Sequence, residues 1–367
     1  MTQTVLLGDI CHYVTEKIAV GEVALQDYVS TENLIADKKG LSLATNLPQV
    51  GKVTKYQAGD VLVSNIRPYF KKIWLANREG GASNDVLVFR PKTEDVANRY
   101  LFYILANDKF FDYSTASSSG SKMPRGDKAQ IMKYPVHLPN LETQKKIADI
   151  LGTIDEKIEL NQRMNETLEQ MGQALFRHYF IDNPEAEKWE DGVLGDIIVN
   201  FDSKRKPLSS RQRAEMQGEY RYFGATSVMD YVNDYLFDGK YLLLAEDGSV
   251  MKKNGTPYLQ YVWGKFWVNN HAHILQAKEP FTVEYLYLLL SQANVQSLVS
   301  GAVQLKINQK AMNSFKIKLP TSTLVEEFCA SIDPMFAQRR KNEEEIQTLT
   351  TLRDTLLPRL ISGKVKV

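Results

Sequence analysis

The sequence predicts an α+β fold in which two similar α/β globular domains alternate with two long helices that pair antiparallel as an intramolecular coiled coil. Three observations support this prediction. The chain of 367 residues repeats itself over nearly its whole length. Each repeat ends in a segment with a helical apolar stripe, and the rest of each repeat mixes short β-rich runs with a helical run. A tandem repeat of this kind is expected to have approximate two-fold symmetry.

The repeat is anchored near both ends of each copy. Leu7-Gly8-Asp9-Ile10 recurs as Leu194-Gly195-Asp196-Ile197, and Ser119-Gly120 recurs as Ser300-Gly301. From there the two copies align without a gap, so that residues 134–139 are aligned with residues 315–320. The predicted division is a first globular domain at 1–139, a helical segment at 140–182, a second globular domain at 183–320 and a second helical segment at 321–367.

Each helical segment carries a narrow apolar stripe. Steps of four and three residues select, in the first segment, Ile147, Leu151, Ile154, Ile158, Asn161, Asn165, Leu168, Gly172, Leu175 and Tyr179. The matching positions in the second segment are Phe328, Ile332, Met335, Arg339, Asn342, Ile346, Leu349, Arg353, Leu356 and Leu360. This spacing predicts helices over about 141–180 and 321–361.

Asparagines and prolines interrupt these stripes. Asn161 and Asn342 occupy equivalent positions, where a buried Asn would fix the register of pairing; two solvated side chains are the alternative. Pro334 and Pro358 each lack a backbone donor, so we expect a kink or a stop at both. Antiparallel pairing within one chain would hide both stripes and place the globular domains at opposite ends. Parallel pairing between two chains is the competing arrangement.

The globular domains share a plan of strands and one helix. In the first domain, strands are predicted at 61–63 and 86–89, a helix at 99–111, and turns at 58–60 and 79–81. In the second domain, strands are predicted at 241–244 and 266–268 and a helix at 283–290. The two domains are therefore expected to be related in fold and different in surface.

Two polar segments of the first domain supply groups that suit contact with nucleic acid. Residues 64–72 combine an amide, cations and an aromatic ring at a strand end, and the candidates there are Asn65, Arg67, Tyr69, Lys71 and Lys72. Residues 117–128 combine small residues with hydrogen-bond donors, and the candidates there are Ser119, Ser121, Lys122, Arg125 and Lys128. A solvated surface loop is the alternative for both segments.

The second domain has a glycine-centred polar loop at the same register, residues 300–310. Its candidate DNA contacts are Gln304, Lys306, Asn308 and Lys310, and the two amides can pair with adenine. Ser83-Asn84-Asp85 is also weakly echoed by Asn269-Asn270-His271, which adds Asn84, Asn270 and His271 to the candidates. Similar loops at one register in both domains strengthen the hypothesis for each.

The sequence contains no recognisable catalytic motif. Asp333-Pro334-Met335-Phe336 lacks the second proline of the amino-methyltransferase tetrad, and neither a dinucleotide fingerprint nor a phosphate loop occurs. Glu246-Asp247-Gly248, with Lys252 and Lys253 nearby, fits a turn after a strand better than a nuclease site. We therefore predict that the chain is not an enzyme.

Metal, disulfide and membrane chemistry are not expected. His271 and His273 have no Cys or carboxylate at ligand spacing, and Cys11 and Cys329 lie too far apart in sequence to suggest a disulfide framework or a zinc site. No export signal and no stretch of about 18 apolar residues occurs. These features predict a cytoplasmic protein without a metal.

The balance of charge limits how a nucleic acid could be bound. The formal net charge is +1 and the pI is about 7.7, whereas nucleic-acid-binding domains often have a pI above about 9. DNA binding would therefore require local clusters of cations, with further phosphate contacts supplied by partner subunits.

Several segments resemble the specificity subunits of type I restriction-modification enzymes. Residues 139–148 and 173–176 are similar to the family's central helical region, and residues 352–363, Leu-Arg-Asp-Thr-Leu-Leu-Pro-Arg-Leu-Ile-Ser-Gly, are similar to its distal one. Residues 59–68 and 265–273 are similar to recurring segments of its target-recognition domains. Leu324-Val325-Glu326-Glu327 departs from the Leu-Glu-Glu-Gln that the family favours. The resemblance covers the whole chain.

This resemblance implies a non-catalytic subunit in which each recognition domain reads one half of a bipartite, asymmetric DNA site. The helices would set the spacer length and dock two methyltransferase subunits, and the full complex would add translocating endonuclease subunits. S-adenosylmethionine, ATP and magnesium would bind to those partners, so no cofactor is expected on this chain. A helical adaptor with peptide-binding heads is the main alternative, and a lack of salt-dependent DNA affinity would favour it. A repressor-like binder that acts alone is a second alternative.

Overall fold

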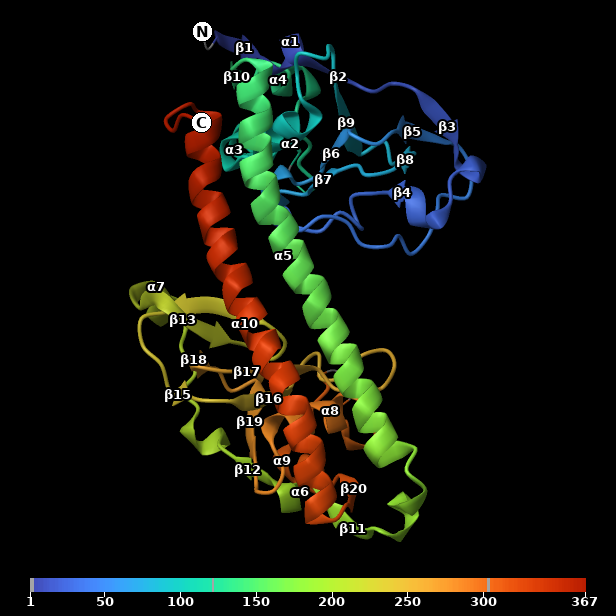
Figure 1. Cartoon of the computed structure of the whole chain (residues 1–367), viewed down its shortest axis with the longest axis vertical. Coiled ribbons are helices and arrows are strands. Elements are labelled where there is room, and N and C mark those ends of the chain that lie inside the picture. Colours follow the sequence, from blue (N-terminus) through green and yellow to red (C-terminus); the bar gives the residue numbers. More distant parts are fainter. Residues whose placement is uncertain (1–2, 121, 302–303) are drawn as a thin grey trace. The chain divides into compact units, whose positions relative to one another are not determined.

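The computed structural model describes residues 3–120, 122–301 and 304–367, and the chain divides into two compact units. The first unit consists of Met1–Leu160 and Glu345–Val367, and the second consists of Asn161–Glu344. Each unit combines one globular part with a portion of both long helices (Figure 1). Because the helices are shared in this way, the compact units do not coincide with the four segments predicted from the sequence.

Within the described residues, the globular part of the first unit contains three small sheets. An antiparallel sheet has the order β2 (Cys11–Tyr13), β9 (Val86–Pro91), β6 (Val61–Ser64) and β7 (Ile73–Leu75). A mixed sheet has the order β3 (Lys17–Ala19), β5 (Lys52–Tyr56), β8 (Gly80–Ala82) and β4 (Tyr28–Val29). A two-stranded ribbon pairs β1 (Gln3–Leu6) with β10 (Pro135–Leu138). The strands predicted at 61–63 and 86–89 are confirmed.

The second unit repeats this plan. Its antiparallel sheet has the order β12 (Ile198–Asn200), β19 (Ala272–Ala277), β16 (Tyr241–Ala245) and β17 (Leu259–Val262). Its mixed sheet has the order β14 (Val228–Val232), β13 (Gln217–Phe223), β18 (Lys265–Val268) and β15 (Phe237–Asp238). The ribbon pairs β11 (Glu190–Val193) with β20 (Lys316–Leu319).

Three strands of each mixed sheet have an equivalent in the other mixed sheet, and the fourth strand does not. In the first unit β8 pairs parallel with β4 and antiparallel with β5, and in the second unit β18 pairs parallel with β13 and antiparallel with β15. The fourth strand, however, is added at opposite edges: β3 lies beside β5, whereas β14 lies beside β13. The units therefore have a common frame with different edges.

The repeated Leu-Gly-Asp-Ile motif forms a one-turn helix in each unit, α1 (Leu7–Ile10) and α6 (Leu194–Ile197). Asp9 accepts a hydrogen bond from the Leu6 backbone N–H at 2.9 Å, and Asp196 does the same for Val193 at 2.8 Å. The Leu and Ile of each motif are buried. The motif is therefore a capped helical turn that anchors each domain to its core.

Two predictions about local structure in the first domain were wrong. The helix expected at 99–111 is two helices, α2 (Asn98–Ala106) and α3 (Asp108–Ala116), because Asn107 is extended and its side chain caps α3 by accepting from the Lys109 N–H. Gly80 and Gly81 lie in β8 and do not form the predicted turn. A Cβ on Gly80 would lie 2.2 Å from the Asp27 carbonyl oxygen, so glycine serves close packing there.

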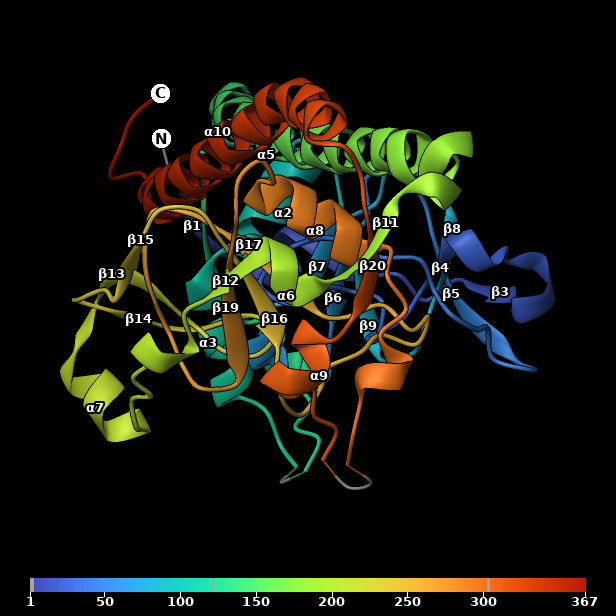
Figure 2. The ribbon, with the colours of Figure 1, turned by 90° about the horizontal axis from the view of Figure 1, so that it is seen from below.

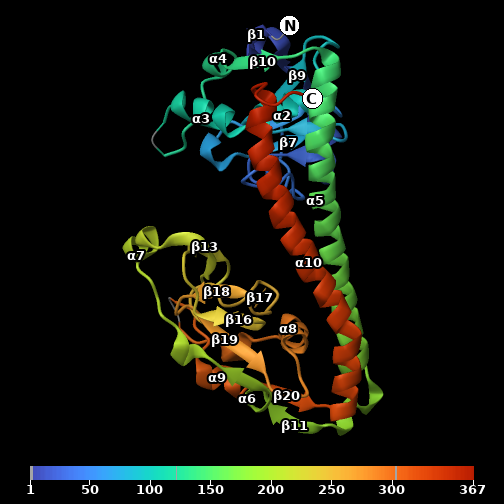
Figure 3. The same cartoon turned by 60° about the vertical axis from the view of Figure 1, so that its left-hand side comes forward.

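The remaining short helices cover the sheets. In the second unit, α8 (Val283–Ser291) lies against β16, β17 and β19, which confirms the helix predicted at 283–290 (Figure 2). Small helices α4 (Lys128–Ile131) and α9 (Gln309–Asn313) precede β10 and β20, and α4 lies near β10 in Figure 3. α7 (Ser210–Glu215) packs beside β14.

Cys11 and Cys329 are free and buried, and burial raises the pKa of Cys11 to about 12.

The long helices are α5 (Leu141–Phe176), which continues as π-helical η4 (Arg177–Ile181), and α10 (Ser322–Ile361). Every side chain of the two predicted stripes is buried or half-buried. The prediction that the helix stops at Pro334 or Pro358 was wrong, since α10 runs through both. An interior proline loses one backbone hydrogen bond, and the burial of Ile332 and Phe336 on either side of Pro334 offsets that loss.

No helix in the described ranges is both long and apolar enough to cross a membrane.

The helices pair antiparallel within the chain. In the first unit Arg353 pairs with Asp155 at 3.0 Å, and in the second unit Arg339 pairs with Glu169 at 3.1 Å. As the residue number increases along α5, the residue number of its partner in α10 decreases. This confirms the intramolecular arrangement over parallel pairing between two chains.

Asparagines form a buried polar cluster in the helical part of the second unit. Asn342 is 2% exposed; it donates to Asn165 Oδ1 at 2.8 Å and accepts from Gln338 at 2.7 Å. Asn161 is 0% exposed. The alternative of two solvated asparagines was therefore wrong, and the interpretation that these side chains specify register is the one that fits their burial.

Replacing Asn342 with leucine is expected to destabilise the second unit by about 1–3 kcal/mol, because Asn165 Oδ1 and the Gln338 amide lose their partners. The double variant Asn165→Leu/Asn342→Leu should regain most of this loss, since neither amide of the pair then remains buried. Urea unfolding of both variants measures the difference. Equal stability of the single and double variants would contradict the proposed coupling.

Candidate nucleic-acid interface

Three segments of the first unit meet at the end of β6. We call residues 64–67, 83–85 and 117–126, apart from residue 121, the first loop cluster. Asn65 N–H donates to the Asp85 carbonyl oxygen at 2.8 Å, and Gly126 N–H donates to the Asn65 carbonyl oxygen at 3.2 Å. Ser119 and Arg125 exchange backbone hydrogen bonds of 2.9 and 3.0 Å, which close the hairpin 119–125.

Three segments of the second unit meet at the end of β16 in the same way. The second loop cluster consists of residues 245–248, 269–271 and 300–307, apart from 302 and 303. Glu246 N–H donates to the His271 carbonyl oxygen at 2.9 Å, and Ile307 N–H donates to the Glu246 carbonyl oxygen at 2.9 Å. Ser300 and Lys306 exchange two bonds of 2.8 Å. Each of the backbone bonds named for the first cluster thus has a counterpart in the second.

Glycines make the two hairpins possible, as the sequence predicted. Gly120 and Gly301 have φ of +104° and +92°, the left-handed region that disfavours other residues. A Cβ on Gly301 would lie 2.2 Å from the Gln304 carbonyl oxygen. The hairpins therefore depend on glycine at the shared position.

The first loop cluster is predominantly cationic. Arg67, Lys122 and Arg125 belong to it, and Asp85 pairs with Arg125 at 3.0 Å. Lys122 and Arg125 are exposed, and Arg67 is half-buried. A local excess of positive charge therefore exists at these loops despite the net charge of +1.

The second loop cluster has a buried charge network beneath it. His273 is 1% exposed; its Nε2 faces the Ile307 carbonyl oxygen at 2.8 Å and its Nδ1 faces Asp202 Oδ2 at 2.6 Å. Arg205 donates to Glu246, and Lys306 pairs with Glu246 at 3.1 Å. Both ring nitrogens of His273 therefore lie within hydrogen-bond distance of an oxygen atom. The network ties residues 202–205 to the ends of β16 and β19.

The same groups raise the question of a metal site. The ligating atoms of Asp202, Glu246 and His273 lie within 4.8 Å of one another. Sequence spacing did not reveal these carboxylates beside His273, because they come from distant segments. Two cations, Arg205 and Lys306, already neutralise Glu246, and a divalent ion would have to displace them. The donor set fits an ion-pair network better than a metal centre.

Acid is expected to destabilise the second unit through this network. Burial raises the pKa of Asp202, but the hydrogen bond and charge of His273, the Ile274 N–H and Arg205 together bring it below its ordinary value of 3.8. Glu246 behaves in the same way: burial raises its pKa, and Arg205, His273 and Lys306 bring it below 4.5. The stabilisation is present above those ordinary values and is lost as the pH falls through the depressed ones.

Hydrogen exchange of β16 and β19 between pH 6 and about pH 3 measures this loss. An Asp202→Asn variant should be less stable at pH 6 and show a flatter pH profile. Equal acid sensitivity of wild type and Asp202→Asn would rule out this origin.

The candidates in the first domain divide into accessible and engaged side chains. Tyr69 is 48% exposed, and Lys128 is exposed. Lys71 pairs with Asp108 at 3.0 Å, Lys72 donates to the Thr31 carbonyl oxygen at 2.6 Å, and Asn84 accepts from Lys17 at 2.7 Å. Asn65 is buried. Ser119 and Arg125 lie in the first loop cluster, and Ser121 lies outside the described residues.

The candidates in the second domain divide likewise. Gln304, Asn270 and Lys310 are exposed. His271 pairs with Asp247 at 2.7 Å, and Asn308 caps α9 by accepting from the Ala311 N–H at 2.9 Å. All of these except Asn308 and Lys310 belong to the second loop cluster, together with Lys306. The sequence reasoning missed Arg205, for which the basic run 204–206 was the only local signal.

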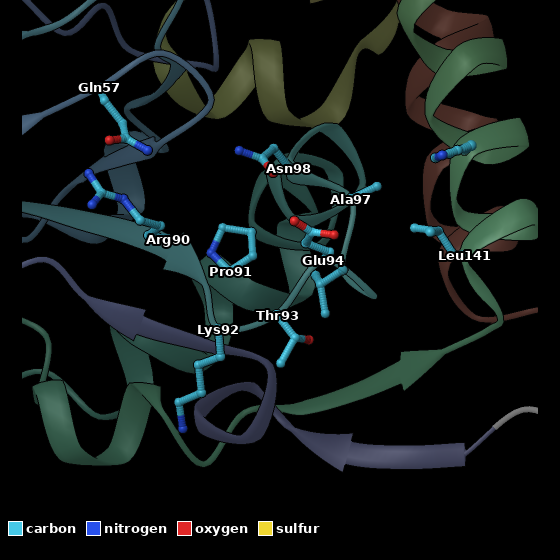
Figure 4. Close-up of a pocket in the computed structure, with 11 residues that line it drawn as sticks. Gln57, Arg90, Pro91, Lys92, Thr93, Glu94, Ala97, Asn98 and Leu141 are labelled. Carbon is cyan, nitrogen blue, oxygen red and sulfur yellow. The ribbon is translucent and has the colours of Figure 1, made fainter.

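A surface pocket of about 590 Å³ lies elsewhere in the first unit, where β9 ends and α2 and α5 begin (Figure 4). Lys92, Glu94 and Asn98 are among its lining residues. None of the predicted contact residues lines it. The pocket is therefore separate from the two loop clusters.

Both halves of the chain are similar to a known protein family. The family described as the type I restriction modification DNA specificity domain matches residues 3–170 and again residues 186–328. The chain belongs to this family. It is a specificity subunit with two recognition domains, one in each unit, and catalysis in type I systems belongs to other subunits.

Individual relatives agree with this assignment. The MjaIX specificity subunit of Methanocaldococcus jannaschii is 26% identical over 312 residues, which cover 75% of this chain and 70% of that one. S.HindORF215P of Haemophilus influenzae, assigned as a type I specificity subunit, is 30% identical over 162 residues, which cover 44% of this chain and 40% of that protein. The crystal structure of the S subunit from M. genitalium has the same fold, with a TM-score of 0.62, 14% identity, and coverage of 98% and 96%.

Proposed function

We propose that the two loop clusters are the DNA-reading surfaces of this specificity subunit and that each reads one half of a bipartite, asymmetric site. The observation that supports this most is the pair of equivalent backbone frames with different side chains. A shared frame presents loops to DNA in the same way, and different side chains select different bases.

The accessible side chains have distinct tasks in this proposal. Lys122 and Lys128 contact phosphates beside the first half-site, and Lys310 does so beside the second. Gln304 and Asn270 supply amides that can pair with base edges. Lys71, Lys72 and Asn308 hold the loops in place, because their side chains already bind other parts of the protein.

The long helices take the second part of the function. We propose that α5 and α10 set the distance between the half-sites and dock two methyltransferase subunits, and that translocating endonuclease subunits join in the full complex. S-adenosylmethionine, ATP and magnesium then bind to those partners.

Co-expression with the methyltransferase subunit, followed by genome-wide mapping of methyladenine, tests the proposal. We expect one split motif, with slower methylation in Lys122→Ala and Gln304→Ala. Lys188→Ala is the matched control, because Lys188 is exposed and pairs only locally with Glu185 at 2.7 Å. If the complex forms but neither loop variant affects methylation, the loop clusters are not the reading surfaces.

A further inference from the structure

Arg67 and Gly248 occupy the same position in the two loop clusters. Arg67 N–H donates to the Pro124 carbonyl oxygen at 2.8 Å, and Gly248 N–H donates to the Leu305 carbonyl oxygen at 3.0 Å. Both residues have positive φ, +51° for Arg67 and +79° for Gly248. The common frame therefore imposes a left-handed turn at this point, whatever the side chain.

Arginine is an unfavourable residue for such a turn. Glycine adopts the left-handed region freely, whereas a Cβ there is strained, and strained residues concentrate where a side chain has a task. The second unit has the residue that suits the backbone. The first unit has a cation that does not suit it, so the reason for arginine must lie in its side chain.

The surroundings of the Arg67 guanidinium leave it available. Its Nη2 donates to the Lys122 carbonyl oxygen at 3.3 Å, and its Nε is buried without a hydrogen-bond partner among the described residues. No carboxylate of the described chain forms a salt bridge with it, whereas Asp85 pairs with the neighbouring Arg125 at 3.0 Å. Pro68 follows Arg67 directly and restricts the backbone there. The Lys122 carbonyl oxygen thus holds one nitrogen of the guanidinium, and no carboxylate among the described residues neutralises its charge.

We propose that Arg67 is the specificity-determining residue of the first recognition domain and that its guanidinium reads a guanine through N7 and O6 in the major groove. This inference rests on the proposed function of the loop clusters. A planar group with fixed donors matches those two acceptors, and this pairing discriminates one base from the others. The second domain, with Gly248 in place of arginine, makes no such contact, so the half-sites differ at this position.

Arg67→Gly is the decisive variant, because it removes the side chain and also relieves the turn. We expect its complex with the methyltransferase to form and its Tm to equal or exceed that of the wild type. Methylation at the original motif should fall about 10- to 100-fold, and one guanine of the first half-site should become degenerate. Arg67→Ala should show the same degeneracy. Its Tm should be lower than that of Arg67→Gly, since alanine retains the strain of the left-handed turn and glycine does not.

Lys38→Gly is the matched control. Lys38 also has positive φ, +62°, and is a cation, but its side chain pairs with Asp108 at 3.1 Å. It should leave the motif unchanged, and the same loss of guanine in this variant would overturn the proposal by tracing the effect to the backbone. An unchanged motif methylated more slowly at every site in Arg67→Gly would also overturn it, because that outcome indicates a phosphate contact.

Competition binding with duplexes that carry each of the four bases at the guanine position decides the matter where methylation is too slow to map. Loss of preference for guanine supports the proposal, and retained preference overturns it. If Lys122→Ala and Gln304→Ala affect methylation but Arg67→Gly does not, this inference alone fails. If none of the three has an effect, the proposed function of the loop clusters fails with it.

Discussion

Replacing Arg90 with methionine is expected to destabilise the first unit by about 3–5 kcal/mol, the usual cost of leaving a buried charge without its partner. Asp60 is 0% exposed, and Arg90 binds both of its carboxylate oxygens at 2.7 Å. The other donor to this carboxylate is the Gln57 N–H at 2.9 Å. Methionine keeps much of the volume of arginine, so the change isolates the charge.

The double variant Asp60→Asn/Arg90→Met should recover most of this loss, because asparagine removes the charge and still accepts from Gln57. Hydrogen exchange of β6 and β9 reports the first unit, and β16 and β19 of the second unit serve as the internal reference. A single variant as stable as the double variant would show that the Asp60 charge is not held by Arg90.

Lengthening both long helices by one heptad is expected to lengthen the gap between the two half-sites of the DNA motif. Seven residues inserted between Leu160 and Asn161, and seven between Glu344 and Glu345, fall at the junction of the compact units and preserve the phase of the stripe. The added rise is about 10 Å, which corresponds to no more than about three base pairs. Methylation of the original motif should disappear, and the same half-sites with a longer gap should become methylated.

The same seven residues inserted in the exposed segment before β11 provide the control, since they lengthen the chain but not the helices. That variant should keep the original spacing. A heptad variant that forms its complex and methylates the original motif would show that helix length does not set the gap.

Features that depend on neighbours in the sequence could be predicted from it. The stripes of α5 and α10 follow the helical period, and every predicted seam position is buried or half-buried. The glycine-centred hairpins could be predicted because Gly120 and Gly301 stand at one register in the repeat. Antiparallel pairing was one of two arrangements that would cover both stripes, and the ion pairs between the two helices decide in its favour.

Features that depend on distant segments could not be predicted. His273 meets Asp202, Glu246 and the Ile307 carbonyl oxygen from separate parts of the second unit, and no spacing along the chain reveals this. The strain at Arg67 also depends on a hydrogen bond to Pro124 in another loop. The prolines of α10 were misjudged because local propensity favours a break, whereas burial of the surrounding side chains maintains the helix.

The segments of the chain that form each compact unit also determine when that unit can fold during translation. The second unit is one continuous segment, Asn161–Glu344, and is complete as soon as that segment has left the ribosome. The first unit must wait, because Leu357, Leu360 and Ile361 pack in its core with Leu151. The domain that is synthesised first is therefore finished last, and a chain interrupted before residue 357 exposes apolar surface that chaperones and proteases can recognise.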